Sequence, residues 1–303
     1  MHQAQVNNWG DSPQYVEVSE LELPKPDEIR LKVDAVGLHR VVRSRAAGKH
    51  YSSAALPHVP GVDGTGTTED GRKVYFFSFA VGGMAEHVNM PKNSIIPLPE
   101  GVNPLQTAGI VNPAMSSWMA FKSRTSNLPK EFTVLKVGAT SASGRVAIPL
   151  ASSLGAERVI GVARNQAALD TLDLDDSIII EDEIEKTDFS SLGDVDVILD
   201  YVYGPLTEHL FKSLKTTKPV EYVHIGALAS MTINLPGDVL RSKNLTIRGS
   251  GPGAWSFKEV VDAIPDILAA LKQVPEQPIK VVKLADVEKE WKSSGSERVV
   301  FVP

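Results

Sequence analysis

The sequence predicts an α/β protein in which a doubly wound parallel sheet follows a smaller β-rich region. Two observations predict the sheet. Apolar strands alternate with helical segments from Phe132 onward, and a run of small residues at 138–144 joins the first of these strands to a helix. A third observation sets the β-rich region apart, since the first third of the chain has short alternating strands broken by proline and glycine. Continuous apolar strands between helices are typical of a parallel sheet that helices cover on both faces.

In the β-rich region, residues 29–35 alternate apolar and charged side chains, which is the period of two expected for a half-buried strand. Residues 73–77 form a further expected strand. Prolines keep this region out of long helices. They are Pro24, Pro26, Pro57, Pro60, Pro91, Pro97, Pro99 and Pro104. We therefore predict a compact domain of short strands and loops.

The rest of the chain predicts the elements of the sheet and a short C-terminal β segment. A helix is expected at Leu105–Lys122, interrupted by Pro113, and Pro149 predicts a kink in a later helix. The expected strands of the sheet are 132–137, 158–163, 177–180, 195–201, 220–226 and 245–249. The expected later helices are 142–154, 165–172, 205–214 and 257–271, and strands at 279–283 and 298–302 end the chain. Six strands in this alternation fit a doubly wound dinucleotide-binding fold.

Composition excludes several classes of protein. The chain has 303 residues, no cysteine and a net charge of −6. Without cysteine there are no disulfides, no thiolate zinc sites and no iron–sulfur clusters. The negative charge gives no general attraction to nucleic acids or anionic membranes. No apolar run reaches the roughly 18 residues of a membrane span, and no signal peptide is visible, so we expect a cytoplasmic protein with no membrane partner.

The most informative segment is the expected strand, turn and helix around residues 138–144. A dinucleotide pyrophosphate binds backbone N–H groups at a helix N-terminus where no side chain blocks its approach. The usual G-x-G-x-x-G pattern is reduced here to Ala139-x-Ser141-x-x-Gly144. We predict that the cofactor contacts Gly138, Ala139, Thr140, Ser141, Ala142, Ser143 and Gly144. The alternative is an ordinary strand–helix turn, because many such turns are rich in small residues.

An arginine follows the second strand of the sheet, where an NAD-specific site places an acidic residue against the ribose hydroxyls. Arg164 stands at this position and Asn165 follows it. A carboxylate would repel a 2′-phosphate, whereas a guanidinium binds it bidentately. The sequence therefore predicts NADPH rather than NADH, with Arg164 and Asn165 as cofactor contacts. The alternative is a solvent-exposed arginine at the end of a strand.

A series of short motifs runs along nearly the whole chain. They are Gly37-Leu-His39, Pro60-Gly-Val-Asp-Gly64, Gly82-Gly-Met-Ala-Glu86, Pro97-Leu-Pro-Glu-Gly101, Asn112-Pro-Ala-Met-Ser-Ser-Trp118, the 138–144 loop, Asp196–Tyr201 and Ile225-Gly-Ala227. Their order and spacing resemble the medium-chain dehydrogenase/reductase superfamily, in its zinc-independent quinone oxidoreductase-like branch. The resemblance implies a GroES-like β-rich domain over 1–106, completed by 260–303, and a Rossmann NADPH-binding domain over 107–259.

The resemblance also bears on a metal site. Zinc-dependent members place ligands near the positions that read His39, Val62-Asp63 and Asn112 here. One imidazole and one carboxylate are too few, because a catalytic zinc site uses three protein ligands, so we expect no metal. Quinone reductases of this branch commonly carry Asn and Asp where this chain has His39 and Val42. The roles of the family's Asn and Asp are therefore not assigned to His39 and Val42.

The resemblance implies further site residues. It places Asn112 and Ser116 near the nicotinamide, as partners of the carboxamide or ribose; the alternative is a helix-capping Asn and a buried Ser. Tyr51 and His39 are candidates to orient a carbonyl or relay a proton, with packing roles as the alternative. The candidate catalytic residues are thus Tyr51, His39 and Asn112. Further cofactor contacts are expected after the last three strands of the sheet, at Tyr201, Tyr203, Gly226, Ala227 and Gly251.

A local basic cluster occupies residues 39–50. Its members are His39, Arg40, Arg43, Arg45, Lys49 and His50. Our interpretation is a solvated helix face, and the alternative is a site for an anionic substrate or a phosphate. A nucleic-acid site is not expected, because aromatic interleaving and a basic net charge are both missing.

Two functional hypotheses follow. The first is an NADPH-dependent, zinc-independent oxidoreductase that reduces quinones, enones or related activated carbonyls by hydride transfer, with a small molecule as substrate. The second is a non-catalytic NADPH-binding protein of the same fold, with a structural or regulatory role. Only the first predicts NADPH consumption. The resemblance also implies a homodimer, because members of the family usually pair their Rossmann sheets edge to edge, and an exposed edge strand here would allow that pairing.

Overall fold

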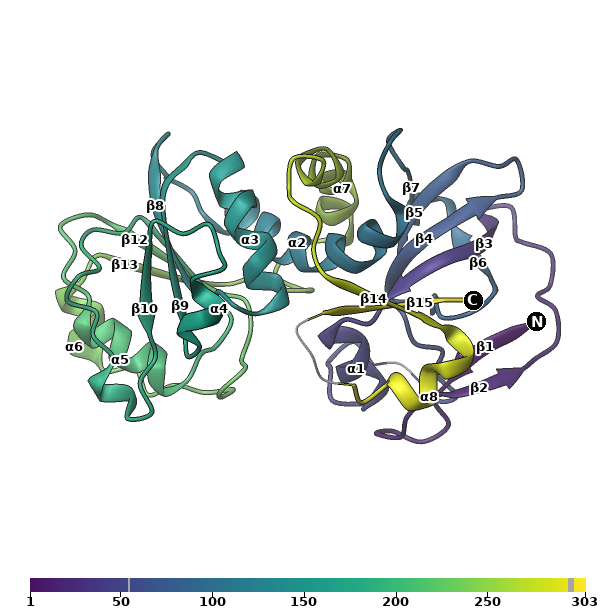
Figure 1. Ribbon diagram of the computed structural model, residues 1–303, viewed down its shortest axis with the longest axis horizontal. Coiled ribbons are helices and arrows are strands. Elements are labelled where there is room, and N and C mark those ends of the chain that lie inside the picture. Colours follow the sequence, from purple (N-terminus) through teal and green to yellow (C-terminus); the bar gives the residue numbers. More distant parts are fainter. Residues whose placement is uncertain (54, 294–296) are drawn as a thin grey trace. The chain divides into compact units, whose positions relative to one another are not determined.

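The computed structural model divides the chain into two compact units, whose elements are labelled in Figure 1. The first unit comprises Met1–Pro113 and Val261–Pro303, and the second comprises Ala114–Val260. Both boundaries fall inside helices, namely α2 (Pro104–Arg124) and α7 (Phe257–Leu271). The structure describes residues 1–53, 55–293 and 297–303. Within these residues, no helix is both long enough and apolar enough to cross a membrane.

The second unit contains a six-stranded parallel sheet with the order β10-β9-β8-β11-β12-β13. Its strands are β8 (Phe132–Val137), β9 (Ala156–Ala163), β10 (Asp176–Ile179), β11 (Val197–Asp200), β12 (Val220–His224) and β13 (Leu245–Gly249). Its helices include α3 (Ala142–Ser153), α4 (Gln166–Leu169), η2 (Ile184–Lys186), α5 (Pro205–Ser213) and α6 (Gly237–Ser242). The chain leaves β8 toward β9 and β10 and later returns to β11 on the other side, which is the doubly wound order. The predicted Rossmann sheet is confirmed.

Strand β8 lies at the centre of this sheet because both of its faces are apolar. Val134 shares a buried cluster with Phe121 of α2 and Ile148 of α3. Leu135, the next residue, points to the opposite face and shares a buried cluster with Leu210 of α5. Covering both faces in this way produces a near-continuous apolar strand. Each fully buried side chain of this size contributes about 1.5–3 kcal/mol to the free energy of unfolding.

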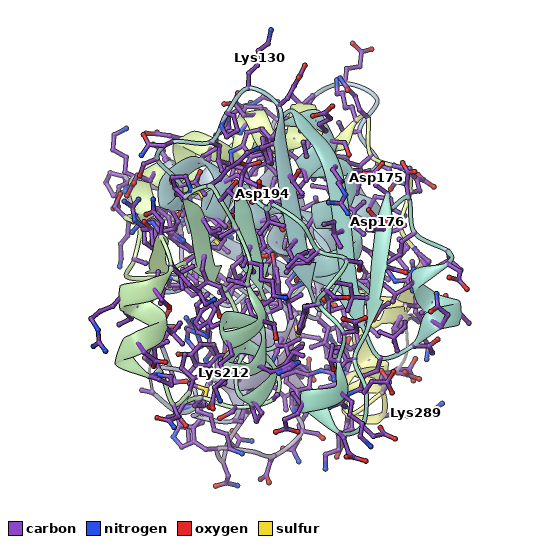
Figure 2. All side chains as sticks on the ribbon, turned by 90° about the vertical axis from the view of Figure 1, so that its left-hand side faces the viewer. Lys130, Asp175, Asp176, Asp194, Lys212 and Lys289 are labelled. Atoms are coloured by element: carbon purple, nitrogen blue, oxygen red, sulfur yellow. The ribbon has the colours of Figure 1, made fainter. Side chains whose placement is uncertain are left out.

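The two edges of this sheet differ. On the β10 side, Asp176 forms an ion pair with Arg158 at 2.6 Å, and Asp175 accepts a hydrogen bond from the Val159 N–H at 2.7 Å. Figure 2 shows both carboxylates beside this edge strand. Charged side chains on an edge strand oppose pairing with another strand. The β13 edge carries Ile247, which is 39% exposed, beside the exposed Arg248.

The first unit is built on a seven-stranded sheet with the order β14-β15-β3-β4-β5-β7, in which β6 also pairs with β3. The strands of this unit are β1 (His2–Gln5), β2 (Gln14–Glu17), β3 (Glu28–Gly37), β4 (Asp63–Thr68), β5 (Lys73–Phe77), β6 (His87–Pro91), β7 (Ile95–Pro97), β14 (Ile279–Lys283) and β15 (Arg298–Val302). Its short helices are α1 (Arg40–Ala46), η1 (Lys92–Ser94), η3 (Leu284–Asp286) and α8 (Val287–Glu290). Strand β15 pairs antiparallel with β3, so two distant stretches of chain share one sheet.

Helices α2 and α4 differ from the expected ones, whereas α3 matches its expected range. Helix α2 continues through Pro113, and α3 continues through Pro149, although each proline removes one backbone hydrogen bond. Packing of the apolar sides of both helices against the sheet outweighs that local loss. Helix α4 covers only Gln166–Leu169, where 165–172 was predicted, because the chain turns as the Leu172 N–H bonds to the Leu169 oxygen at 2.9 Å.

Candidate functional site

A tight turn joins β8 to α3 in the second unit. Gly138 has a φ of +89°, which glycine adopts most readily, and the N–H groups of Gly138 and Ala139 donate to the Val162 oxygen at 2.9 and 3.1 Å. A Cβ at Gly144 would lie 2.4 Å from the carbonyl oxygens of Gly138 and Ala139. The Ser141 hydroxyl caps α3 by accepting from the Gly144 N–H at 3.0 Å. Only glycine at 144 lets the helix begin so close to the turn.

The first turn of α3 presents backbone donors to solvent. Among the residues that the structure describes, no acceptor meets the N–H groups of Thr140, Ala142 or Ser143. The first turn contains no acidic residue, and α3 is 12 residues long, so its N-terminus carries the positive end of a full helix dipole. Small side chains leave this surface open. The turn therefore fits the pyrophosphate of a dinucleotide.

The ends of β11 and β12 lie against the same turn. A Cβ on Gly138 would lie 3.5 Å from the Tyr201 Cβ, and a Cβ on Gly226 would lie 3.0 Å from the Tyr201 oxygen. Ala227 and Gly251 follow the ends of β12 and β13 at the same carboxyl edge, because all six strands are parallel. The structure thus brings together residues predicted from separate motifs. They surround the point between β8 and β11 where the strand order reverses, which is where such sheets bind nucleotides.

A buried carboxylate fixes the turn after β11. The Asp200 Oδ1 accepts from the N–H groups of Val202 and Tyr203 at 2.7 and 3.0 Å, and Oδ2 accepts from the hydroxyls of Thr207 and Tyr222 at 2.6 and 2.7 Å. Tyr203 has a φ of +58°, a conformation that disfavours a residue with a Cβ by about 1–2 kcal/mol. Burial, and then the charge of Asp200, raise the pKa of Tyr222. Asp200 was not predicted as a site residue, although an acid that ends an apolar strand was a usable signal.

A buried lysine lies beside the Tyr201 ring. The Tyr201 hydroxyl lies 2.9 Å from the Ser116 Oγ and 2.7 Å from the Ser117 Oγ, both on α2. The Lys136 Nζ lies 3.1 Å from the centre of the Tyr201 ring and has no hydrogen-bond partner among the described residues. Lys136 is 2% exposed, and burial lowers its pKa well below the ordinary value while Asp200 opposes that shift. Lys136 was not predicted as a site residue, although a lysine inside an apolar strand was a usable signal.

The predicted phosphate-selecting residues follow β9 at the same carboxyl edge. Arg164 is exposed, and no acidic residue occupies its position. The Asn165 side chain accepts from the Ala168 N–H at 3.0 Å and caps α4. Asn165 therefore has a local structural role, whereas the Arg164 guanidinium is available to solvent.

The predicted catalytic residues differ in exposure. Tyr51 is 72% exposed, and its ring stacks on His50 with the ring centres 4.1 Å apart. His39 is 2% exposed, and its Nε2 lies 3.2 Å from the Asp63 Oδ1 without hydrogen-bond alignment. Asn112 is half-buried in the interior of α2, so it does not cap that helix.

The surroundings of His39 are polar and buried. Asp63 is 0% exposed and accepts from the Tyr75 hydroxyl at 2.9 Å. Burial lowers the pKa of Arg298 to about 10, and the charge of Asp63 acts in the opposite direction. A Cβ at Gly37 would lie 2.3 Å from the His39 Nε2, so the glycine of the Gly37-Leu-His39 motif makes room for the imidazole. The sequence motif did not indicate Tyr75 or Arg298.

Comparison with known proteins identifies the family of this chain. The chain is 32% identical to the probable NADPH-dependent quinone reductase tdiC of Emericella nidulans, and the alignment covers 100% of both proteins. The chain belongs to the quinone oxidoreductase family of medium-chain dehydrogenases/reductases. No protein-family model matches the chain.

Two further relatives of the quinone oxidoreductase family extend this result. A quinone oxidoreductase of Sus scrofa is 27% identical over 47% of this chain and 46% of its own length. The solved quinone oxidoreductase of Thermus thermophilus, which was also determined with NADPH, has a TM-score of 0.78 at 23% identity and covers 100% of both chains. The predicted family and the predicted combination of a Rossmann sheet with a GroES-like domain are confirmed.

Few side chains in the described part of the chain are placed to bind zinc. Within the described ranges, no group of three His, Asp or Glu side chains lies close enough together to hold a metal ion. The chain also has no cysteine. His39 and Asp63 supply one imidazole and one carboxylate, which is fewer than the three protein ligands of a catalytic zinc site.

The interpretation of the basic cluster at 39–50 as a solvated helix face is wrong in part. Arg40 and Lys49 are exposed, but Arg45 is only 3% exposed and Arg43 is half-buried. Arg45 shares the inner face of α1 with Val42, because residues three apart lie on the same side of a helix. The cluster therefore places one guanidinium inside the first unit.

Proposed function

We propose that this chain reduces quinones, enones or related activated carbonyls with NADPH and without a catalytic metal. The observation that carries the proposal is the carboxyl edge of the six-stranded sheet. There the open N-terminus of α3 and the exposed Arg164 offer separate positions for a pyrophosphate and a 2′-phosphate. The full-length relative at 32% identity, a probable NADPH-dependent quinone reductase, supports quinones as substrates.

The residues of the second unit would hold the cofactor as follows. The N–H groups of Thr140, Ala142 and Ser143, which meet no acceptor among the described residues, would donate to the pyrophosphate, and Arg164 would pair with the 2′-phosphate. Backbone groups of Gly226, Ala227 and Gly251 would bound the cofactor along the sheet edge, with Tyr203 and Ser116 as side-chain contacts. Bound NADPH supplies the hydride. The protein then has to orient the acceptor and manage one proton.

Tyr51 fits the proton or orienting role better than His39. A substrate can meet the Tyr51 side chain without rearrangement, because that side chain is 72% exposed. The His39 ring is 2% exposed and faces Asp63, so in this conformation it reaches no substrate. We assign His39 a supporting position and keep Asn112 as a nicotinamide contact. Water or a ribose hydroxyl remains a sufficient proton source if Tyr51→Phe keeps full activity.

The test follows NADPH and NADH consumption by purified protein with a panel of quinones and enones. We expect turnover with NADPH, and Arg164→Asp should lower the NADPH:NADH ratio of kcat/KM by about tenfold or more, because a charged hydrogen bond contributes about 1.5–3 kcal/mol. Arg241→Asp is the matched control, since Arg241 is exposed on α6 in the same unit. Tight NADPH binding with no turnover across the panel would favour the non-catalytic alternative.

We also propose a homodimer in which the β13 edges of two chains pair. Ile247 on this strand is 39% exposed, and Leu240 in α6 is 49% exposed. Ile247→Lys places a charge on the edge, which opposes pairing. Sedimentation equilibrium should show a dimer for the wild type and a shift toward monomer for Ile247→Lys; a monomeric wild type would refute this. The cytoplasmic location stays a prediction.

A further inference from the structure

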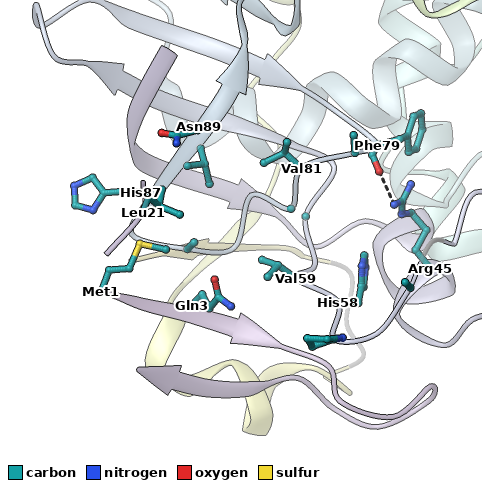
Figure 3. A pocket seen from close by; sticks show the side chains of 17 residues that line it. Met1, Gln3, Leu21, Arg45, His58, Val59, Phe79, Val81, His87 and Asn89 are labelled. Atoms are coloured by element: carbon teal, nitrogen blue, oxygen red, sulfur yellow. Dashed lines mark hydrogen bonds between the residues drawn. The ribbon is translucent and has the colours of Figure 1, made fainter. Parts of the chain in front are cut away.

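A cavity of about 470 Å³ lies within the first unit, between residues 55–61 and residues 79–89 (Figure 3). The residues that line it all belong to this unit, and none of the proposed cofactor contacts is among them. Its volume lies in the range of about 300–1,000 Å³ that small-molecule sites occupy. The cavity is therefore large enough for an organic ligand and separate from the proposed nucleotide site.

A buried cation faces this cavity. Arg45 lines it and is 3% exposed. Its Nη1 donates to the Ser52 Oγ at 3.0 Å, its Nη2 donates to the Phe79 oxygen at 2.7 Å, and its guanidinium lies 5.1 Å from the centre of the Phe79 ring. The Nε has no partner among the described residues. Buried charges in proteins are normally paired with an opposite charge, and here both recorded partners are neutral.

The rest of the lining offers no counter-charge. No aspartate or glutamate is among the described residues that line the cavity. His58, which also lines it, has a pKa lowered by burial and then by the positive charge of Arg45, so the histidine stays neutral at ordinary pH. The site therefore has one permanent positive charge and neutral donors around it. That set suits a single negative charge, because a phosphate dianion needs more donors.

The middle of the cavity is apolar. Figure 3 shows Arg45 and Phe79 at one end, Met1, Leu21 and His87 at the other, and Val59 and Val81 between them. We propose that this cavity binds a monocarboxylate with an apolar body, with the carboxylate on Arg45 and the body along Val59 and Val81. The site is independent of the proposed reductase function, since it requires neither NADPH nor turnover.

The first experiment compares octanoate with octanamide by isothermal titration calorimetry on the purified full chain without NADPH. The two probes share their alkyl body and differ in charge. We expect saturable binding of octanoate and an affinity for octanamide that is about tenfold lower or more, because the amide lacks a charged hydrogen bond to Arg45. Equal affinities, or no saturable binding of octanoate, would overturn the proposal.

Variants test the position of the ligand. Arg45→Met should weaken octanoate binding about tenfold or more, whereas Arg43→Met should leave it unchanged, because Arg43 bonds to the Ser293 oxygen and does not line the cavity. Val81→Phe fills the apolar middle and should abolish binding while keeping Arg45. Octanoate binding that is retained in Val81→Phe would overturn the proposed position of the ligand. If Arg45→Met does not fold, Val81→Phe and the comparison with octanamide still test the proposal.

Discussion

Replacing Lys136 by methionine should make this protein more stable. Lys136 belongs to the central strand β8 and is 2% exposed, and among the described residues its amine has only the face of the Tyr201 ring as a partner. Methionine keeps an unbranched apolar stem of similar length and removes the amine. The substitution therefore removes a desolvation penalty and leaves the packing of the strand nearly intact.

The magnitude follows from the burial of the amine. Burying a polar group without a hydrogen bond costs about 1–3 kcal/mol in proteins, and a buried cation–π contact returns about 2 kcal/mol to the charged form. Burial lowers the pKa of Lys136 well below its ordinary value. Between the folded pKa and the unfolded value of about 10.4, the unfolded chain binds more protons, so wild-type stability rises with pH by up to about 1.4 kcal/mol per unit.

We expect Lys136→Met to raise the free energy of unfolding by about 1–4 kcal/mol near pH 7, with a smaller gain near pH 9. Urea unfolding followed by circular dichroism at the two pH values measures both quantities. Lys130→Met is the control, because Lys130 points away from the fold (Figure 2) and should shift stability by about 0.5 kcal/mol or less. A destabilised Lys136→Met, or a gain that is the same at both pH values, would refute the reasoning.

Three further changes test other parts of the second unit and the histidines of the chain. Ser141→Ala removes the cap on the Gly144 N–H and should lower the free energy of unfolding by about 1 kcal/mol; unchanged urea unfolding would contradict this. Tyr222→Phe removes the hydroxyl that donates to buried Asp200 and should lower the free energy of unfolding by about 1.5–3 kcal/mol. A loss below about 0.5 kcal/mol would be inconsistent with that hydrogen bond. Acid should destabilise the protein first through three half-buried histidines, because partial burial lowers their pKa values and the unfolded chain takes up protons below about pH 6.5. They are His50, His58 and His224. The melting temperature should fall between about pH 7 and pH 5.5, and a flat profile there would argue against it.

Much of the nucleotide-binding unit could be predicted from local sequence. Gly138 and Gly144 bracket a small-residue turn because a positive φ and a close backbone approach each require glycine, and both constraints act within a few residues. Arg164 could be placed because a strand end lies at a fixed distance in sequence from that turn. The length of α4 and the continuity of α2 could not be predicted from the sequence, since packing overrides helix-breaking residues such as Pro113.

By itself, the sequence determined the doubly wound sheet, the family, the absence of cysteine ligands and the arginine that replaces an acid after β9. Only the tertiary structure decided which polar groups are buried and what they meet. Lys136 lies against the Tyr201 ring, and Arg45 lies inside the first unit rather than on a solvated helix face. The physical reason is that periodicity reports the face on which a residue lies, whereas burial and pairing depend on segments that are distant in sequence and meet only in the folded chain.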